Sequence, residues 1–314
     1  MIGIKHITSY IPADFIDNFE QGEKFGESRD YIINKIGAHR LPRKLNGQET
    51  SDLACCAIEK LLKECTLSQE KMQALVVVTQ NGDGYGLPHT SAIVHKKLGL
   101  CQDVATFDVS LGCSGYVYGL AILKGFLQAS GLKSGMLVTA DPYSKIIDPT
   151  DRITTLLFGD AATATWLGED ALWDVGRPTF MTDSYRGCHL AVNKGKLQMN
   201  GWQIFNFAAT NVPSHINKML DAENLTAEDV DCFFVHQGTA AIVEAIAKKF
   251  PTVRERFILD LSTTGNTVSS SIPILLEKYY KEPSIKRVLL SGFGVGLSLA
   301  TILLDKREER YVND

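Results

Sequence analysis

The sequence predicts an α/β protein built from two similar halves, each a β-sheet with helices on both faces. Three observations support this class. The chain has 314 residues, of which 45% are hydrophobic and 22% charged, as in ordinary globular proteins. Short apolar runs typical of buried strands alternate with longer segments of helical periodicity. Finally, the pattern of the first half returns in the second half, which indicates a duplicated unit.

The duplication is carried by three pairs of segments with the same order of turn, buried strand, Gly-containing turn and helical pattern. The pairs are 66–80 with 224–237, 107–123 with 259–276, and 135–168 with 286–304. Strands that alternate with helices predict parallel sheets. We therefore expect halves of residues 1–168 and 169–314, related by a pseudo-twofold axis and packed without a flexible linker.

Three reactive side chains follow predicted strands, and ligands of open α/β sheets bind beyond the carboxyl ends of strands. They are Cys113 after strand 105–109, His236 after strand 232–235, and Asn266 after strand 257–261. Because the halves repeat, Cys113 and Asn266 occupy matching turns. We expect these two residues to face each other across the pseudo-twofold axis, with His236 nearby.

A helix is predicted to begin near Gly115, directly after Cys113. The positive end of a helix dipole favours thiolate, so we expect the Cys113 pKa to lie below its ordinary value of about 8.5. Taken singly, each residue also has a structural interpretation: a buried thiol, a histidine bonded to a carbonyl, and an asparagine in a turn. Together, in the contexts LGCSG, VHQG and STTGNT, they favour nucleophilic catalysis by Cys113, assisted by His236 and Asn266.

Composition excludes several other classes of protein. The net charge of −4 and pI near 6.0 argue against nucleic-acid binding. The longest apolar stretch, 288–304, is interrupted by Gly and Ser and is too short to span a membrane, and the N-terminus lacks the features of an export signal. Seven cysteines without a CxxC pair indicate reduced thiols in the cytoplasm and no metal site.

At these motifs the chain resembles the β-ketoacyl-acyl-carrier-protein synthase III family of thiolase-like condensing enzymes. The resemblance covers nearly the whole chain, in the segments YIINKIGAHR, LPHTSAIVHKKLG, DVSLGCSGYVYGL, DRITTLLFGDAATA, GWQIFNFA, VHQG, STTGNTVSSSIP and GFGVGLSLA. It implies the five-layer αβαβα fold of that family, which agrees with the internal duplication. It also implies a homodimer.

The resemblance implies a two-stage reaction without a cofactor. Cys113 would accept an acyl group from acyl-CoA, its oxyanion held by the backbone N–H groups of Cys113 and Val295. A malonyl thioester, on an acyl carrier protein or on coenzyme A, would then lose carbon dioxide while His236 and Asn266 bind its carbonyl oxygen. The carbanion would attack the acyl group and give a β-ketoacyl thioester for fatty-acid-related or secondary metabolism.

The family pattern also assigns binding roles by position. Coenzyme A recognition is implied for Tyr31, Lys35 and Arg152; the acyl pocket for Leu87, Phe158 and Phe205; and carrier docking for Lys248 and Lys249. Leu87 would act across the dimer interface, where its small side chain would admit a longer or branched acyl group.

The chain departs from the family pattern at several of these positions. Lys35 replaces an arginine, and Val295 replaces a glycine. Two cations expected near the carrier-docking helix are replaced by Asn206 and Ala241, which weakens the attraction of an acidic carrier. These departures favour a specialised pathway.

Three alternatives remain open. One is an acyl transferase of the same fold that does not decarboxylate, and another is a non-catalytic partner of a condensing enzyme. The third is a cysteine hydrolase, which uses the same Cys, His, Asn order. The duplication and the lack of a CGSCW-like context disfavour the hydrolase.

Overall fold

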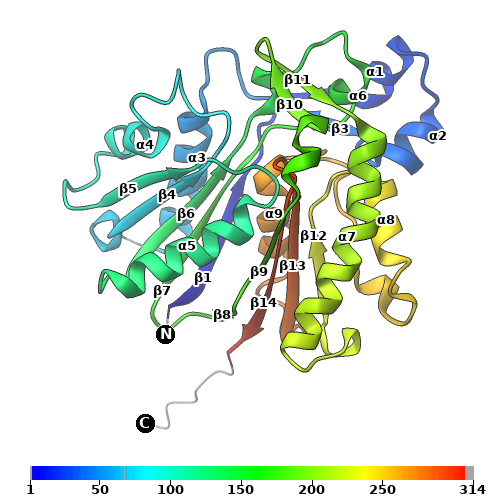
Figure 1. Cartoon of the computed structure of the whole chain (residues 1–314). Coiled ribbons are helices and arrows are strands. Elements are labelled where there is room, and N and C mark those ends of the chain that lie inside the picture. The colour runs from blue at the N-terminus through cyan, green and yellow to red at the C-terminus, as the bar shows by residue number, and fades with distance from the viewer. Residues whose placement is uncertain (1, 67, 308–314) are drawn as a thin grey trace.

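The computed structural model describes residues 2–66 and 68–307. Its first half contributes one side of a continuous mixed sheet, with strand order β1–β7–β6–β4–β5 (Figure 1). These strands are β1 (Gly3–Tyr10), β4 (Ala74–Val78), β5 (Ala105–Val109), β6 (Ser134–Ala140) and β7 (Ala162–Gly168). Helices α3 (Thr50–Glu64) and α4 (Thr90–Leu98) cover the outer face of this side.

The second half of the chain contributes the other side of the sheet. Its strands are β9 (Thr179–Thr182), β12 (Cys232–Val235), β13 (Arg287–Gly294) and β14 (Ser298–Lys306). Helices α7 (Gly201–Ala222) and α8 (Ala240–Ala247) lie outside them (Figure 1). The short strand β8 (Trp173–Val175) pairs with both β1 and β14, which joins the two halves into one ten-stranded sheet.

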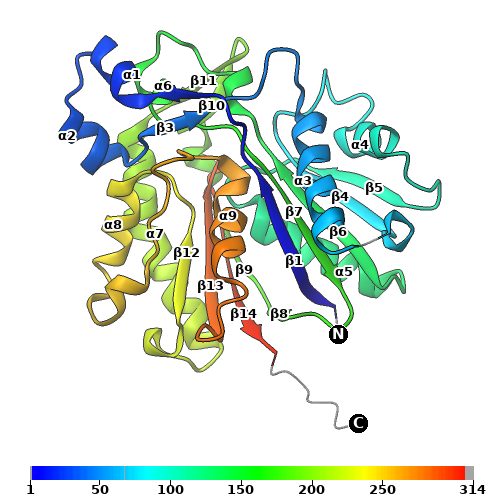
Figure 2. The same cartoon turned by 180° about the vertical axis from the view of Figure 1, so that it is seen from behind.

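Two helices fill the space between the halves. They are α5 (Gly115–Ala129), which follows Cys113, and α9 (Ser271–Tyr279), which follows Asn266. Each contacts strands of both halves, and α9 lies between them in both views (Figures 1 and 2). The layers therefore run helix, sheet, helix, sheet, helix, which confirms the predicted thiolase-like αβαβα fold.

Smaller elements gather at one end of the molecule, at the top of Figures 1 and 2. They are β2 (Phe15–Asp17), α1 (Asn18–Lys24), α2 (Arg29–Tyr31), the π-helix Ile32–Ile36, β3 (Arg40–Pro42), α6 (Arg152–Thr155), β10 (Leu190–Asn193) and β11 (Lys196–Met199). Short 3₁₀ turns occur at Gln69–Lys71, Tyr143–Lys145, Ser184–His189, Ala227–Asp229, Pro251–Arg256 and Val268–Ser270. No helix among the described residues is long and apolar enough to cross a membrane.

The prediction of wholly parallel sheets is wrong. The pairs β4–β5, β4–β6 and β12–β13 are parallel, but β1–β7, β6–β7 and β13–β14 are antiparallel. A parallel pair needs a long crossover connection. Only a short turn separates Gly294 from Ser298, so β13 and β14 must run in opposite directions.

The predicted strand at 257–261 is also absent, because Phe257 alone forms a bridge pair, with Phe233 of β12. The Gln237 side chain makes the contacts that a strand would have made. Its Nε2 donates to the Ile258 carbonyl at 3.1 Å, and its Oε1 accepts the Asp260 N–H at 3.0 Å. The amide side chain thus supplies hydrogen bonds that a neighbouring strand would otherwise supply to the backbone of this segment.

Candidate active site

Cys113 lies in the turn between β5 and α5, with Ser114 as the first cap residue of the helix. Its side chain is buried, and the backbone N–H groups of Cys113 and Val295 donate toward the sulfur. β13 passes close by: a Cβ added to Gly294 would lie 2.8 Å from the Cys113 sulfur. The two N–H groups that the resemblance assigns to the oxyanion hole therefore meet at the predicted nucleophile.

The predicted lowering of the Cys113 pKa is wrong. Burial raises the pKa of the thiol, and the nearby Asp141 carboxyl raises it further, although the two backbone N–H groups act in the opposite direction. Asp141 is itself buried, which raises its pKa to about 6 even though it accepts hydrogen bonds from the Gln80 N–H and from Ser269. Desolvation outweighs the contribution of the helix start.

His236 directly follows β12 and is 3% exposed. Burial lowers the pKa of its imidazole to about 3, so the ring is neutral near pH 7. Ring atom Nδ1 lies 2.8 Å from the Ser271 hydroxyl, at the start of α9. The ring therefore has one proton and one lone pair to share between Ser271 and the cavity.

Asn266 lies in the turn before α9 and is 6% exposed. Its backbone N–H donates to the Leu157 carbonyl at 2.9 Å, and its Oδ1 accepts the Val268 N–H at 2.9 Å. Val268 holds a left-handed φ of 54°, which is unusual for a β-branched residue. This turn orients the amide so that its Nδ2 is the side-chain donor that remains for a ligand.

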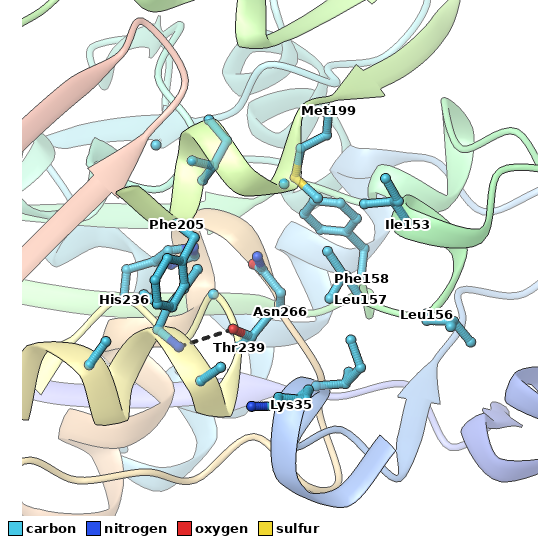
Figure 3. A pocket seen from close by; sticks show the side chains of 18 of the residues that line it. Lys35, Ile153, Leu156, Leu157, Phe158, Met199, Phe205, His236, Thr239 and Asn266 are labelled. Carbon is cyan, nitrogen blue, oxygen red and sulfur yellow. Dashed lines mark hydrogen bonds between the residues drawn. The ribbon is translucent and has the colours of Figure 1, made fainter. Parts of the chain in front are cut away.

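The structure brings Cys113, His236 and Asn266 together on one cavity of about 710 Å³. Figure 3 shows His236, Asn266, Phe158 and Phe205 directed into this cavity. Apolar side chains make up much of the wall, including Leu156, Leu157, Leu190 and Ile204. A mostly apolar cavity with a few converging polar groups suits a thioester.

The residues predicted to bind coenzyme A lie at the mouth of the same cavity. Tyr31, Lys35 and Arg152 all line it, and the Arg152 guanidinium is 6.0 Å from the centre of the Tyr31 ring. Arg152 also pairs with Glu27, a partner that no sequence pattern indicated. An adenine would have to separate Tyr31 from Arg152 before it could lie between them.

Not every predicted binding residue lines the cavity. Phe158 and Phe205 do, but Leu87 is 92% exposed in the loop before α4 and lies outside the cavity of its own chain. The reason is topological, since this loop runs from the carboxyl end of β4 to α4, away from α7 and α8 (Figure 1). Lys248 lines the mouth, but Lys249 does not.

Glu244 and Tyr143 are among the lining residues that the sequence reasoning missed. Glu244 of α8 pairs with Lys248 at 3.4 Å and also with Arg254, so it offsets charge at the mouth. Tyr143 is 2% exposed and packs its ring against Phe158, with centroids 4.8 Å apart. A signal for Tyr143 was present, because it follows the carboxyl end of β6 just as Cys113 follows β5.

A cysteine at two backbone donors, with a neutral imidazole and an oriented carboxamide on one cavity of a thiolase-like fold, defines an enzyme that transfers acyl groups through a thioester. Comparisons with known proteins narrow this class. Family models described as "3-Oxoacyl-[acyl-carrier-protein (ACP)] synthase III" and its "C terminal" match residues 107–184 and 220–306. Together they span more than half of the chain.

Curated relatives and solved structures agree. The β-ketoacyl-[acyl-carrier-protein] synthase III of Lactobacillus helveticus is 32% identical, with 94% of this chain and 96% of the relative covered. That of Lactococcus lactis is 29% identical, with 96% and 98% covered. The crystal structure of the Thermus thermophilus enzyme matches with a TM-score of 0.89 and 28% identity, covering 97% of this chain and 99% of that one. The chain belongs to the 3-oxoacyl-[acyl-carrier-protein] synthase III family, and it is an acyltransferase of the condensing type.

Proposed function

We propose that the enzyme joins an acyl group from acyl-CoA to a malonyl thioester, with loss of carbon dioxide. The observation that carries the proposal is the shared cavity of Cys113, His236 and Asn266. Acyl transfer alone needs the cysteine and its oxyanion hole. A second pair of neutral donors, His236 and Asn266, is what an enolate requires.

In the first stage the Cys113 sulfur attacks the thioester carbonyl of acyl-CoA. The N–H groups of Cys113 and Val295 stabilise the negative oxygen of the tetrahedral intermediate. The bond from carbonyl carbon to the coenzyme A sulfur then breaks, and the departing thiolate takes up the proton that the Cys113 thiol has lost. Because burial raises the pKa of this thiol, we expect thiolate to form only as the substrate enters the site.

In the second stage the malonyl thioester enters the same cavity. Its carbon–carbon bond to the carboxylate breaks, and the electron pair moves onto the thioester carbonyl as an enolate. His236 and Asn266 donate hydrogen bonds to that oxygen, and the α-carbon attacks the acyl carbonyl on Cys113. The carbon–sulfur bond to Cys113 breaks, which releases the β-ketoacyl thioester and regenerates the cysteine.

The low pKa of His236 supports this role. Because the pKa of the His236 imidazole is about 3, the ring is uncharged at neutral pH. A neutral ring donates a hydrogen bond to the enolate oxygen without transferring its proton. Asn266 contributes an amide donor that does not titrate. Both groups stabilise charge that exists only during the reaction.

The same proposal covers substrates and assembly. Tyr31, Lys35 and Arg152 would bind coenzyme A at the mouth, and Lys248 and Lys249 would meet a carrier protein if the malonyl group arrives on one. A homodimer is supported by the position of β5 at the end of the strand order and by the nearby exposed Leu87. Leu87 would then reach the partner's acyl pocket. We also propose two structural halves divided at Gly168, where β7 ends, and a cytoplasmic location in which the cysteines stay reduced.

The test combines intact mass with carbon dioxide release. Purified protein is incubated with acyl-CoA, and an acyl adduct is expected on the wild type and on the control C101A, whose thiol is exposed, but not on C113A. Addition of malonyl-CoA or a malonylated carrier protein should release labelled carbon dioxide and discharge the adduct. An adduct that passes to another acceptor without such release would favour a simple acyl transferase, and no adduct would favour a non-catalytic partner.

A further inference from the structure

Ser271 connects the imidazole of His236 to the turn that orients Asn266. It is 4% exposed at the first position of α9. Its Oγ lies 2.8 Å from His236 Nδ1, 3.1 Å from the Val268 carbonyl oxygen and 3.5 Å from the Gln237 backbone nitrogen. The hydroxyl has one proton, so it can donate to Nδ1 or to the Val268 carbonyl at any one time.

The neighbouring bonds favour donation to the ring. The Val268 carbonyl already accepts the backbone N–H of Ser271, so it does not depend on the hydroxyl. The contact with Nδ1 is the shortest of the three, and the Gln237 N–H can donate to the lone pair that the hydroxyl keeps. Donation from the Ser271 hydroxyl to Nδ1 would leave the single proton of the neutral ring on Nε2.

We propose that Ser271 is a positioning residue that holds His236 as the Nε2–H tautomer, so that the ring presents a donor to the cavity. The inference rests on the proposed function, in which His236 must donate to an enolate oxygen. The opposite tautomer would present a lone pair to the same oxygen, which would repel the enolate. Ser271 therefore determines which ring nitrogen of His236 carries the proton during the second stage of the reaction.

Removal of the hydroxyl has a defined consequence. Burial lowers the pKa of the His236 ring, and the Val268 carbonyl, which lies within hydrogen-bond reach of the ring, acts in the opposite direction and raises this pKa. In S271A this carbonyl is the remaining acceptor, so the ring would move its proton to Nδ1 and donate there. Acylation of Cys113 uses the backbone donors at the sulfur, and we expect it to persist. Decarboxylation should fall about a hundredfold, as when one donor of an oxyanion hole is lost.

The experiment compares wild type, S271A, S271T and S270A in three measurements. These are the rate of the acyl adduct on Cys113, the rate of carbon dioxide release, and the ¹⁵N chemical shifts of histidine-labelled protein, with the His236 signals assigned from H236N. Ser270 is the matched control, because it is the neighbour of Ser271 and its buried hydroxyl bonds to Thr139 Oγ1 at 2.8 Å instead of to His236.

We expect the adduct rate of S271A to lie within about threefold of the wild-type rate, and its rate of carbon dioxide release to be about a hundredfold lower. The ¹⁵N shifts should show that the His236 proton has moved to Nδ1. S271T should restore the Nε2–H signature, and S270A should resemble wild type. Equal loss of both rates in S271A, or an unchanged tautomer, would overturn the proposal. If wild type itself releases no carbon dioxide, the proposed function fails, while the ¹⁵N shifts still decide the role of Ser271.

Discussion

Gly294→Ala is the substitution whose effect the structure defines most directly. The added Cβ would lie 2.8 Å from both the Cβ and the sulfur of Cys113. Carbon atoms in contact are about 3.5–4.0 Å apart, and sulfur is larger, so one group must move by roughly 1 Å. Neither can move freely, because Gly294 pairs with Ser298 in the β13–β14 ladder and Cys113 begins the α5 turn.

The magnitude follows from that displacement. A misplacement of about 1 Å in a reacting group costs on the order of a hundredfold in rate, or about 2.7 kcal/mol of transition-state stabilisation. Overpacking of a filled core costs a further 1–3 kcal/mol or so of folding free energy. We therefore expect G294A to fold with reduced stability and to form the Cys113 acyl adduct about a hundred times more slowly.

Gly125 offers the matched control within α5. A Cβ added there meets nothing within 4 Å, so G125A should keep the adduct rate and gain about 0.5–1 kcal/mol of stability from the lower helix cost of alanine. The assay is adduct formation followed by intact mass, alongside urea unfolding. Acylation of G294A at the wild-type rate would show that the sulfur does not react where the structure places it.

Other predictions concern ionisation and the cavity wall. Because the pKa of Cys113 is raised, its alkylation by iodoacetamide should still accelerate with pH at about pH 9; a plateau near neutral pH would contradict the assigned burial. Burial raises the folded pKa of Asp141 to about 6, above its ordinary 3.8, so its contribution to stability is present below about pH 4 and is lost as pH rises through 6. Across that window wild type should lose up to about 3 kcal/mol relative to D141N in urea unfolding, and parallel curves would refute the assignment. Y143A should accept longer acyl chains, with the ratio of long to short adduct rates rising roughly fourfold per added methylene; an unchanged ratio would place the acyl group elsewhere.

The residues proposed to be catalytic could be predicted from the sequence because their signals are local. Cys113, His236 and Asn266 each follow a predicted strand end within a short Gly-containing motif, and the duplication relates two of the three turns. The fold followed from the same repeat. The motifs and the repeat are both patterns of residues that lie close together in the sequence, so they can be recognised without a structure.

The features that sequence reasoning missed depend on distance through space. Glu27 and Glu244 acquire their roles by pairing with Arg152 and Lys248, and nothing in their local sequence indicates those partners. The direction of the Cys113 pKa shift depends on how completely the thiol is buried, and the periodicity of the sequence does not reveal that burial.

The Gln237 side chain joins β12, which precedes His236, to the segment that leads to Asn266. Gln237 is the residue next to His236, and its side chain hydrogen-bonds to the backbone of Ile258 and Asp260 in the segment that leads to Asn266. The Gln237 amide thus contributes to the spacing between the segments that carry His236 and Asn266, together with the single bridge between Phe233 and Phe257. A family member could retune that gap, and with it the thioester it accommodates, by exchanging this single side chain while leaving both donors intact.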